Sequence, residues 1–317
     1  MPNSADCPDQ VCGKCGSVGG WECGRVRSAE CGIGGEESEG EEGCYVYGVA
    51  GENGRDALLN LDVRGIDPQH PIYPLACRDL LAVVSTVSMR EFGLTTLQSN
   101  LKDIRWLADK ARAHEAVLEA ASNVCTLVPM RFCTIYPNED RVREILDEHH
   151  DVFSQALARL DGKREWGVKC FCDRVILAEK ARETSEKYRQ MQSDAAQKSS
   201  GAAYFLKKKL DETAAAEAER LSDECAQQSH TRLSDCASES VVNPLRDRDL
   251  TGRKDEMILN GAYLVSEDSL SAFKDELTAL SAKYGELGLS CELTGPWPAY
   301  NFAAIGAQEA SDGAVGA

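Results

Sequence analysis

The chain has 317 residues, of which 43% are hydrophobic, and a formal net charge of −17. This length suggests about two domains, and this hydrophobic content is enough for a buried core. The negative charge argues against nonspecific nucleic-acid binding, which depends on Lys and Arg, and against contact with an anionic membrane surface. No run of about 18 apolar residues occurs, so we expect no membrane insertion.

The first 43 residues differ in composition from the rest of the chain. They are rich in Gly, Cys and Glu and contain few aliphatic residues, which predicts a flexible extension over 1–43. Cys12 and Cys15 have the C-x₂-C spacing of a zinc half-site, which Cys23 or Cys31 could complete as a small zinc knuckle. The chain has fourteen cysteines and no basic-then-apolar signal peptide. We therefore expect reduced thiols rather than disulfides.

An N-terminal α+β domain is expected over residues 44–163. Apolar runs and alternations between Gly/Pro turns predict its strands, and a change to helical periodicity predicts its helices. The predicted strands are 44–49, 58–63, 72–76, 80–87 and 124–136, and the predicted helices are 97–121 and 139–160. Asn138 is placed to cap the second helix and Gly162 to follow its end. Pro129 within its apolar run indicates an edge strand or a bulge.

Polar residues in this half have structural interpretations that compete with functional ones. His114 lies on the apolar stripe of its helix, which favours a buried, hydrogen-bonded histidine over a catalytic or ligating one. His149 and His150 are adjacent and point about 100° apart on a helix, so they cannot chelate a metal together. Arg131 fits either a structural ion pair or a contact with an acidic partner.

A C-terminal α+β domain is expected over 164–304, followed by a disordered tail over 305–317. Its pattern is strand 165–172, a long helical region 174–236 with a break at 199–201, strand 257–265, helix 266–284 and strand 289–294. Cys170 and Cys172 share one face of the first strand and are expected to be buried thiols. The fold class is therefore α+β, with two domains. A ferredoxin-like α/β sandwich with a helical insertion is our preferred arrangement for the second.

The last strand runs into a segment that is rich in aromatic residues and proline. Gly295 and Pro296 are expected to end the strand, because proline removes a backbone donor. Trp297, Tyr300 and Phe302 then lie on a stiff, non-helical segment. Either they fill the domain core, or they form an aromatic patch for a partner.

No catalytic signature is present. The chain lacks a P-loop, a G-x-G-x-x-G between strand and helix, an H-E-x-x-H and a G-x-S-x-G. We expect no enzyme activity and no cofactor. A cytosolic thiol or zinc sensor that uses the cysteines of 1–43 is the alternative from another class.

Seven segments, taken together and in order, resemble the gas vesicle protein F/L family. They are Tyr45–Gly48, His114–Leu118, Val128–Phe132, Glu165–Lys169, Gly201–Lys208, Asn260–Val265 and Leu293–Phe302. The resemblance covers roughly residues 44–303, and its last segment is the most specific. Two features depart from the family pattern. Cys133 stands where the family usually has Gly after Arg-Phe, and the extension 1–43 has no counterpart.

The resemblance implies a non-enzymatic accessory protein of gas vesicle nucleation and assembly. Such proteins are minor components of the gas vesicle, also found in the cytoplasm, that bind the small apolar shell protein and other accessory proteins. The resemblance also implies two α+β domains, the second ferredoxin-like, with no catalytic residues. The family-motif residues, which are candidates for interaction, are Pro129, Arg131, Phe132, Trp166, Lys169, Gly295, Pro296, Trp297, Pro298, Tyr300, Asn301 and Phe302.

Overall fold

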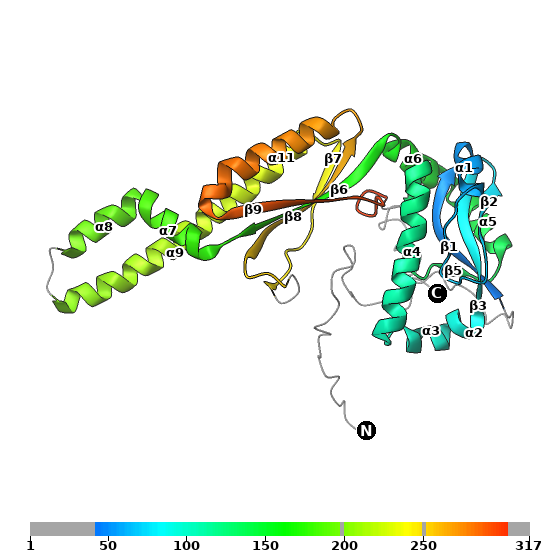
Figure 1. Cartoon of the computed structure of the whole chain (residues 1–317), viewed down its shortest axis with the longest axis horizontal. Helices are drawn as coiled ribbons and strands as arrows, with labels where there is room; N and C mark the ends of the chain where they lie inside the picture. Colours follow the sequence, from blue (N-terminus) through cyan, green and yellow to red (C-terminus); the bar gives the residue numbers. More distant parts are fainter. Residues whose placement is uncertain (1–41, 197–199, 249–251, 304–317) are drawn as a thin grey trace, which may run out of the picture.

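The computed structural model of the chain describes residues 42–196, 200–248 and 252–303. Two sheets, each with its own helices, lie one after the other along the long axis of the molecule (Figure 1). The first half is built by residues 42–162 and the second by the residues that follow. The predicted α+β class is confirmed. Among the described residues, no helix is long and apolar enough to cross a lipid bilayer.

The first sheet is antiparallel and is centred on β1 (Glu42–Gly51). Its order is β2 (Ile72–Cys77), β3 (Leu80–Ser88), β1 and β4 (Leu127–Pro129), and β5 (Ile135–Tyr136) also pairs with β1. Tyr45 and Tyr47 pack into a buried cluster with α4 (Ile104–Val124). Their neighbours Cys44 and Val46 pack with α5 (Glu139–Glu148) and α6 (His150–Leu160). Helices therefore cover both faces, which explains why β1 and β3 are almost entirely apolar.

Four predicted elements of this half differ in the structure. The strand predicted over 124–136 is two short strands, β4 and β5, because a turn at Phe132 and Cys133 separates them. Residues 58–63 are not a strand: α1 (Arg55–Leu59), which follows η1 (Glu52–Gly54), covers the first two, and residues 60–63 form no regular element. The short α2 (Met89–Phe92) precedes α3 (Leu94–Asn100). The helix predicted over 97–121 is interrupted at Asn100, where α3 ends. A new helix starts there because the Asp103 carboxylate caps α4 by accepting from the N–H groups of Arg105 and Trp106. The helix over 139–160 is likewise split, at His149.

The predicted cap residues of that split helix are confirmed. Asn138 accepts a hydrogen bond from Arg141 N at 2.9 Å, which satisfies a donor of the first turn of α5. Gly162 follows the end of α6 with φ 64°, a left-handed conformation that favours glycine.

The second sheet is also antiparallel, with the order β7 (Glu239–Val242), β8 (Glu256–Ser266), β6 (Lys163–Cys172) and β9 (Leu289–Trp297). The sequence prediction missed β7. Side chains of α9 (Ser200–Ser234) and of α11 (Leu270–Tyr284) join those of β6 and β8 in one buried cluster. A short η2 (Gly285–Leu287) links α11 to β9. The element order is β-α-β-β-α-β, the pattern of the ferredoxin-like motif; the ferredoxin-like assignment itself stays a prediction.

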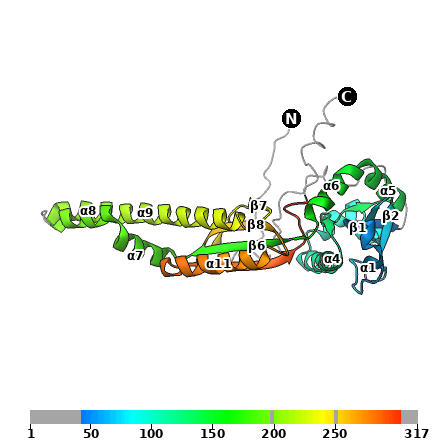
Figure 2. The ribbon, with the colours of Figure 1, turned by 90° about the horizontal axis from the view of Figure 1, so that it is seen from above.

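A helical arm extends from the second sheet, as Figure 2 shows. It consists of α7 (Arg174–Thr184), α8 (Glu186–Ala196) and α9 (Ser200–Ser234), and the first two pack along the third. At 1.5 Å per residue, the 35 residues of α9 span about 50 Å. Most of the break predicted at 199–201 coincides with the start of α9, and Ser199 lies outside the described residues.

The prediction of reduced thiols is wrong for one pair of cysteines. Cys170 of β6 forms a disulfide with Cys291 of β9, across a sequence separation of 121 residues. Antiparallel pairing places these two residues directly opposite each other, a register that sequence periodicity alone does not reveal. Cys172 is a buried free thiol, as predicted.

Candidate interaction surfaces

The C-terminal strap, residues 297–303, links the second sheet to the first half of the molecule. The prediction that the strand ends at Gly295 and Pro296 is wrong, because β9 continues to Trp297. It can do so because β9 is an edge strand, where a missing N–H is tolerated. Gly295 has φ 112°, and a Cβ there would lie 3.1 Å from the Glu165 carbonyl oxygen. The backbone passes β6 at this point in a conformation that suits only glycine.

Two aromatic residues of the strap, Tyr300 and Phe302, pack into the first half rather than into the second. Phe302 and Ala303 are buried in the same cluster as Val46 and Val142 of the first sheet and its helices. Leu264 of β8 also belongs to that cluster. The core-filling interpretation therefore holds for Phe302, with the difference that the core lies in the other half of the chain.

A chain of hydrogen bonds anchors the strap to α4 and β1. Tyr300 Oη lies 3.2 Å from His114 Nε2 and donates to Glu115 Oε1 at 3.1 Å. His114 Nδ1 lies 2.9 Å from Tyr45 Oη, which in turn accepts from Cys133 N at 2.9 Å. Burial lowers the pKa of His114 to about 3, so its ring is neutral. The prediction of a buried, hydrogen-bonded His114 is confirmed.

Glu165 ties the strap to the start of β6. Its carboxylate is 4% exposed and accepts from Asn301 N at 2.9 Å and from Asn301 Nδ2 at 2.6 Å. Burial raises the pKa of this carboxyl to about 7, and the two hydrogen bonds from Asn301 oppose the shift. Asn301 thus compensates for a polar group that would otherwise be costly to bury.

The Val128–Phe132 motif also reaches this junction. Pro129 ends β4, is buried and pairs with Gly48. The Phe132 ring lies edge-on to His114, with centroids 5.7 Å apart. Arg131 is exposed, and its carbonyl accepts from Thr134 Oγ1. Segments that are far apart in the sequence thus build one junction between the two halves of the chain.

Cys133 stands where the family pattern usually has Gly. Its backbone conformation explains that preference for Gly. Its φ is 63°, in the left-handed region that favours glycine, and its N–H is fixed by Tyr45 Oη. Its side chain is buried among the residues that pack against α4. The chain therefore combines a strained backbone position with a packed thiol.

The remaining motif residues lie on the second sheet and its edge. The Trp166 ring lies under the ammonium of Lys274, 5.1 Å from the ring centroid. Lys169 is half-buried opposite Glu292, and burial lowers its pKa. Pro296 is exposed and Pro298 is buried. Trp297 is 40% exposed and donates to Thr294 Oγ1 at 3.1 Å.

A cavity of about 280 Å³ lies where the two halves meet. Its lining includes the end of α4, Arg164, Glu165 and Trp297. Within the described ranges, no three or more His, Cys, Asp or Glu side chains are arranged to hold a metal ion. His150 is instead paired with Asp79 and Asp151. The candidate zinc ligands Cys12, Cys15, Cys23 and Cys31 lie outside the described residues.

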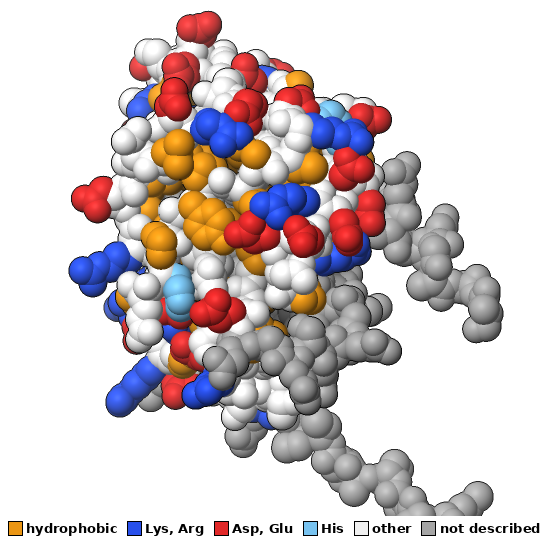
Figure 3. All heavy atoms as spheres, turned by 90° about the vertical axis from the view of Figure 1, so that its right-hand side faces the viewer, with side chains coloured by type: hydrophobic (Ala, Val, Ile, Leu, Met, Phe, Trp, Pro, Cys, Tyr) orange, Lys and Arg blue, Asp and Glu red, His pale blue; other side chains and the backbone are white. Residues whose placement is uncertain are grey.

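Apolar side chains reach the surface along two sheet edges. The β2 edge face consists of the half-buried residues Ile72, Tyr73, Pro74, Ala76 and Cys77, of which all but Pro74 also pack partly against the buried clusters on the two faces of the sheet. It lies at the outer end of the first half, where Figure 3 shows apolar side chains surrounded by charged ones. The β7 edge, at the second sheet, carries the exposed side chains Val241, Val242 and Leu245. Within the described part of the chain, these two edges are candidate surfaces for contact with another protein.

Comparison with known proteins decides the family. The profile of the family described as gas vesicle synthesis protein GvpL/GvpF matches residues 43–304. This chain belongs to that family. It is 34% identical over 266 residues to gas vesicle protein L of a Streptomyces species, covering 84% of this chain and 94% of the relative.

Two solved structures of family proteins have the same fold. Gas vesicle protein GvpF from Anabaena sp. PCC7120 aligns with a TM-score of 0.60 at 19% identity, over 84% of this chain and 97% of that one. GvpF from Microcystis aeruginosa aligns with a TM-score of 0.56 at 22% identity, over 82% and 98%. At these identities the likeness shows the fold alone.

The sequence marked the motif segments, but it did not show that they meet at one junction between the two halves of the chain. Glu165 lies in a family motif and was not singled out, although it is the buried carboxyl of the junction. A carboxylate directly before the apolar residues Trp166 and Val168 was the available signal. The β7 edge was missed because its strand is only four residues long and borders a polar loop.

Proposed function

We propose that this chain is a non-enzymatic accessory protein of gas vesicle nucleation and assembly. In this proposal it binds the apolar shell protein and other accessory proteins, as a minor component of the vesicle and in the cytoplasm. Membership of the GvpL/GvpF family supports a role in gas vesicle assembly. The observation that carries the binding is the apolar, unpaired edge of β7.

Strand β7 pairs with β8 along one side. In the described part of the chain, no strand pairs with its other side, so backbone N–H and C=O groups remain available there. Val241 and Val242 are 36% and 52% exposed and point to opposite faces of the sheet. An extended apolar segment that adds to this edge would gain main-chain hydrogen bonds and side-chain contacts on both faces.

The β2 edge face is less suited to strand addition. Pro74 lies in the middle of the strand and provides no N–H group, which interrupts the ladder that an added strand would form. This face can still offer side-chain contacts to an accessory protein. The acidic surface of the chain, with its net charge of −17, would keep a complex with an apolar partner in solution.

The test is co-purification of the shell protein with variants of the full chain. Val242→Asp places a charge on the β7 edge and is expected to lower the amount of co-purified shell protein at least tenfold, about 1.4 kcal/mol of binding free energy. Val175→Asp is the matched control, because Val175 is 69% exposed on α7, away from β7. Equal recovery with both variants would contradict binding at β7, and no recovery with the wild type would contradict the proposed function.

The sensor alternative depends on cysteines outside the described residues and stays a prediction. Zinc content of the full chain, compared with that of a chain starting at Cys44, tests it. Equal and near-zero zinc in both would remove it.

A further inference from the structure

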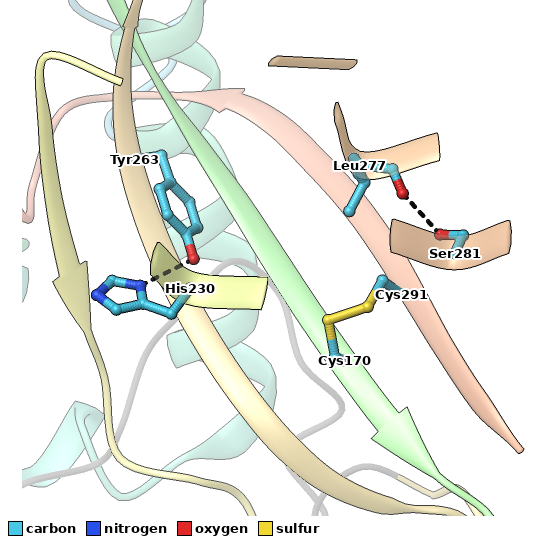
Figure 4. The surroundings of a disulfide bond; sticks show 6 residues. All are labelled: Cys170, His230, Tyr263, Leu277, Ser281 and Cys291. Carbon is cyan, nitrogen blue, oxygen red and sulfur yellow. Dashed lines mark hydrogen bonds between the residues drawn. A yellow bond between two sulfur atoms is a disulfide. The ribbon is translucent and has the colours of Figure 1, made fainter. Parts of the chain in front are cut away.

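The Cys170–Cys291 disulfide is exposed to solvent on one side only. Cys170 is 1% exposed, whereas Cys291 is half-buried. Cys291 also lines an open groove of about 430 Å³, together with Leu277, Ser281 and Leu293. Figure 4 shows Leu277 and Ser281 of α11 on the Cys291 side of the bond. A small thiol can therefore approach the sulfur of Cys291 but not that of Cys170.

Neighbouring thiols of the chain are not suited to attack this bond. Cys172 lies two residues from Cys170 on the same face of β6, and burial raises its pKa to about 11. Burial also raises the pKa of Cys225 on α9. Because the thiolate is the attacking species, both groups are unreactive near neutral pH. Within the described residues, these two neighbouring thiols are therefore not expected to start exchange at this disulfide.

We propose that the Cys170–Cys291 disulfide is a reversible exchange site for a dithiol reductant. One thiolate of the dithiol attacks Sγ of Cys291, the S–S bond breaks, and Cys170 leaves and takes up a proton. The second sulfur of the dithiol then displaces Cys291 from the mixed disulfide. The chain gains two electrons and two protons, and the dithiol leaves as a disulfide.

The position of the bond gives its redox state a structural consequence. The disulfide is the covalent link between edge strand β9 and β6. The strap that follows β9 carries Tyr300, Asn301 and Phe302 into the junction between the two halves. Reduction removes the covalent link and leaves β9 held by sheet hydrogen bonds and by the packing of Leu289 and Leu293, so local opening of β9 and the strap becomes more frequent.

The experiment uses the purified full chain and dithiothreitol as the dithiol. After incubation without denaturant, acid quenching and alkylation, peptide mapping identifies the state of Cys170 and Cys291. We expect them to be linked before treatment and alkylated after it. Amide hydrogen exchange is then compared between the two states. We expect exchange in β9 and residues 298–303 to be at least tenfold faster after reduction, with β1 and β3 unchanged.

Two variants separate this effect from a general loss of stability. The double variant Cys170→Ser/Cys291→Ser should show the fast exchange without dithiothreitol and no response to it. Cys172→Ser, at a buried thiol on the same strand face, should keep the response of the wild type. Three results would overturn the proposal: cysteines that are unlinked in air-oxidised protein, a bond that dithiothreitol cannot reduce while the chain stays folded, or exchange in β9 that reduction leaves unchanged.

Discussion

Glu165 is a buried carboxyl whose folded pKa, about 7, lies above the ordinary value of 4.5. The folded state therefore binds its proton more tightly than the unfolded state between these two pH values. Stability from this group is fully present below about pH 4.5 and is lost as the pH rises to about 7. At 1.36 kcal/mol per pKa unit, the change amounts to about 3 kcal/mol.

Glu165→Gln should remove this pH dependence. The variant cannot ionise, so its unfolding free energy should fall less between pH 5 and pH 7.5 than that of the wild type, by about 2 kcal/mol. Urea denaturation at several pH values measures the difference. Glu267→Gln, an exposed glutamate that lines the same cavity, is the control and should follow the wild type. Parallel pH profiles for wild type and Glu165→Gln would refute the role of this group.

Cys133 provides a second prediction at the residue scale, because its left-handed backbone conformation costs energy for any residue with a Cβ. Cys133→Ala keeps the Cβ, whereas Cys133→Gly removes it, and both remove the buried thiol. Cys133→Gly should therefore be the more stable variant by about 1 kcal/mol. Thermal or urea denaturation of the two variants measures this difference. A more stable Cys133→Ala would show that the left-handed φ at residue 133 does not lower the stability.

At the scale of elements, the strap is the piece on which the arrangement of the two halves depends. Phe302 is 2% exposed in a core of the first half, whereas Trp297 is 40% exposed at the end of β9. Phe302→Ala should lower the unfolding free energy by about 3–5 kcal/mol, as expected for a fully buried aromatic. Trp297→Ala should cost clearly less.

Denaturation curves for the two variants are the measurement. Similar losses for both would mean that Trp297 anchors the strap as firmly as Phe302. A small loss for Phe302→Ala would show that the strap does not hold the two halves together.

Elements with a long, regular pattern could be predicted from the sequence, and elements set by tertiary contacts could not. The apolar stripe of α11 and the alternation in β8 were sufficient to place both. The interruption before α4 depends on one capping carboxylate, Asp103, that the periodicity does not show. The end of β9 was misplaced because Pro296 is tolerated only at an edge, and edge position depends on strand order.

The candidate site was predictable only in part for the same reason. The family motifs marked the residues, but their meeting at the junction depends on contacts such as Tyr300 with Glu115, 185 residues apart. The disulfide was missed because cysteines 121 residues apart become neighbours only when β6 pairs with β9.

At the scale of the whole molecule, two sheets are joined by a packed junction, and each has an apolar edge strand at the surface. The β2 edge face lies at the outer end of the first half and the β7 edge lies on the second. A packed connection between two such edges suits a protein that holds one apolar partner while it contacts another. The acidic charge opposes association of the chain with itself.

The most direct test is gene deletion with complementation in a vesicle-forming host, scored by electron microscopy and by the amount of shell protein. We expect deletion to abolish vesicles while the shell protein is still made. Wild type and Val175→Asp should restore vesicles, and Val242→Asp should not. Vesicles of normal number and shape in the deletion strain would contradict the proposed function.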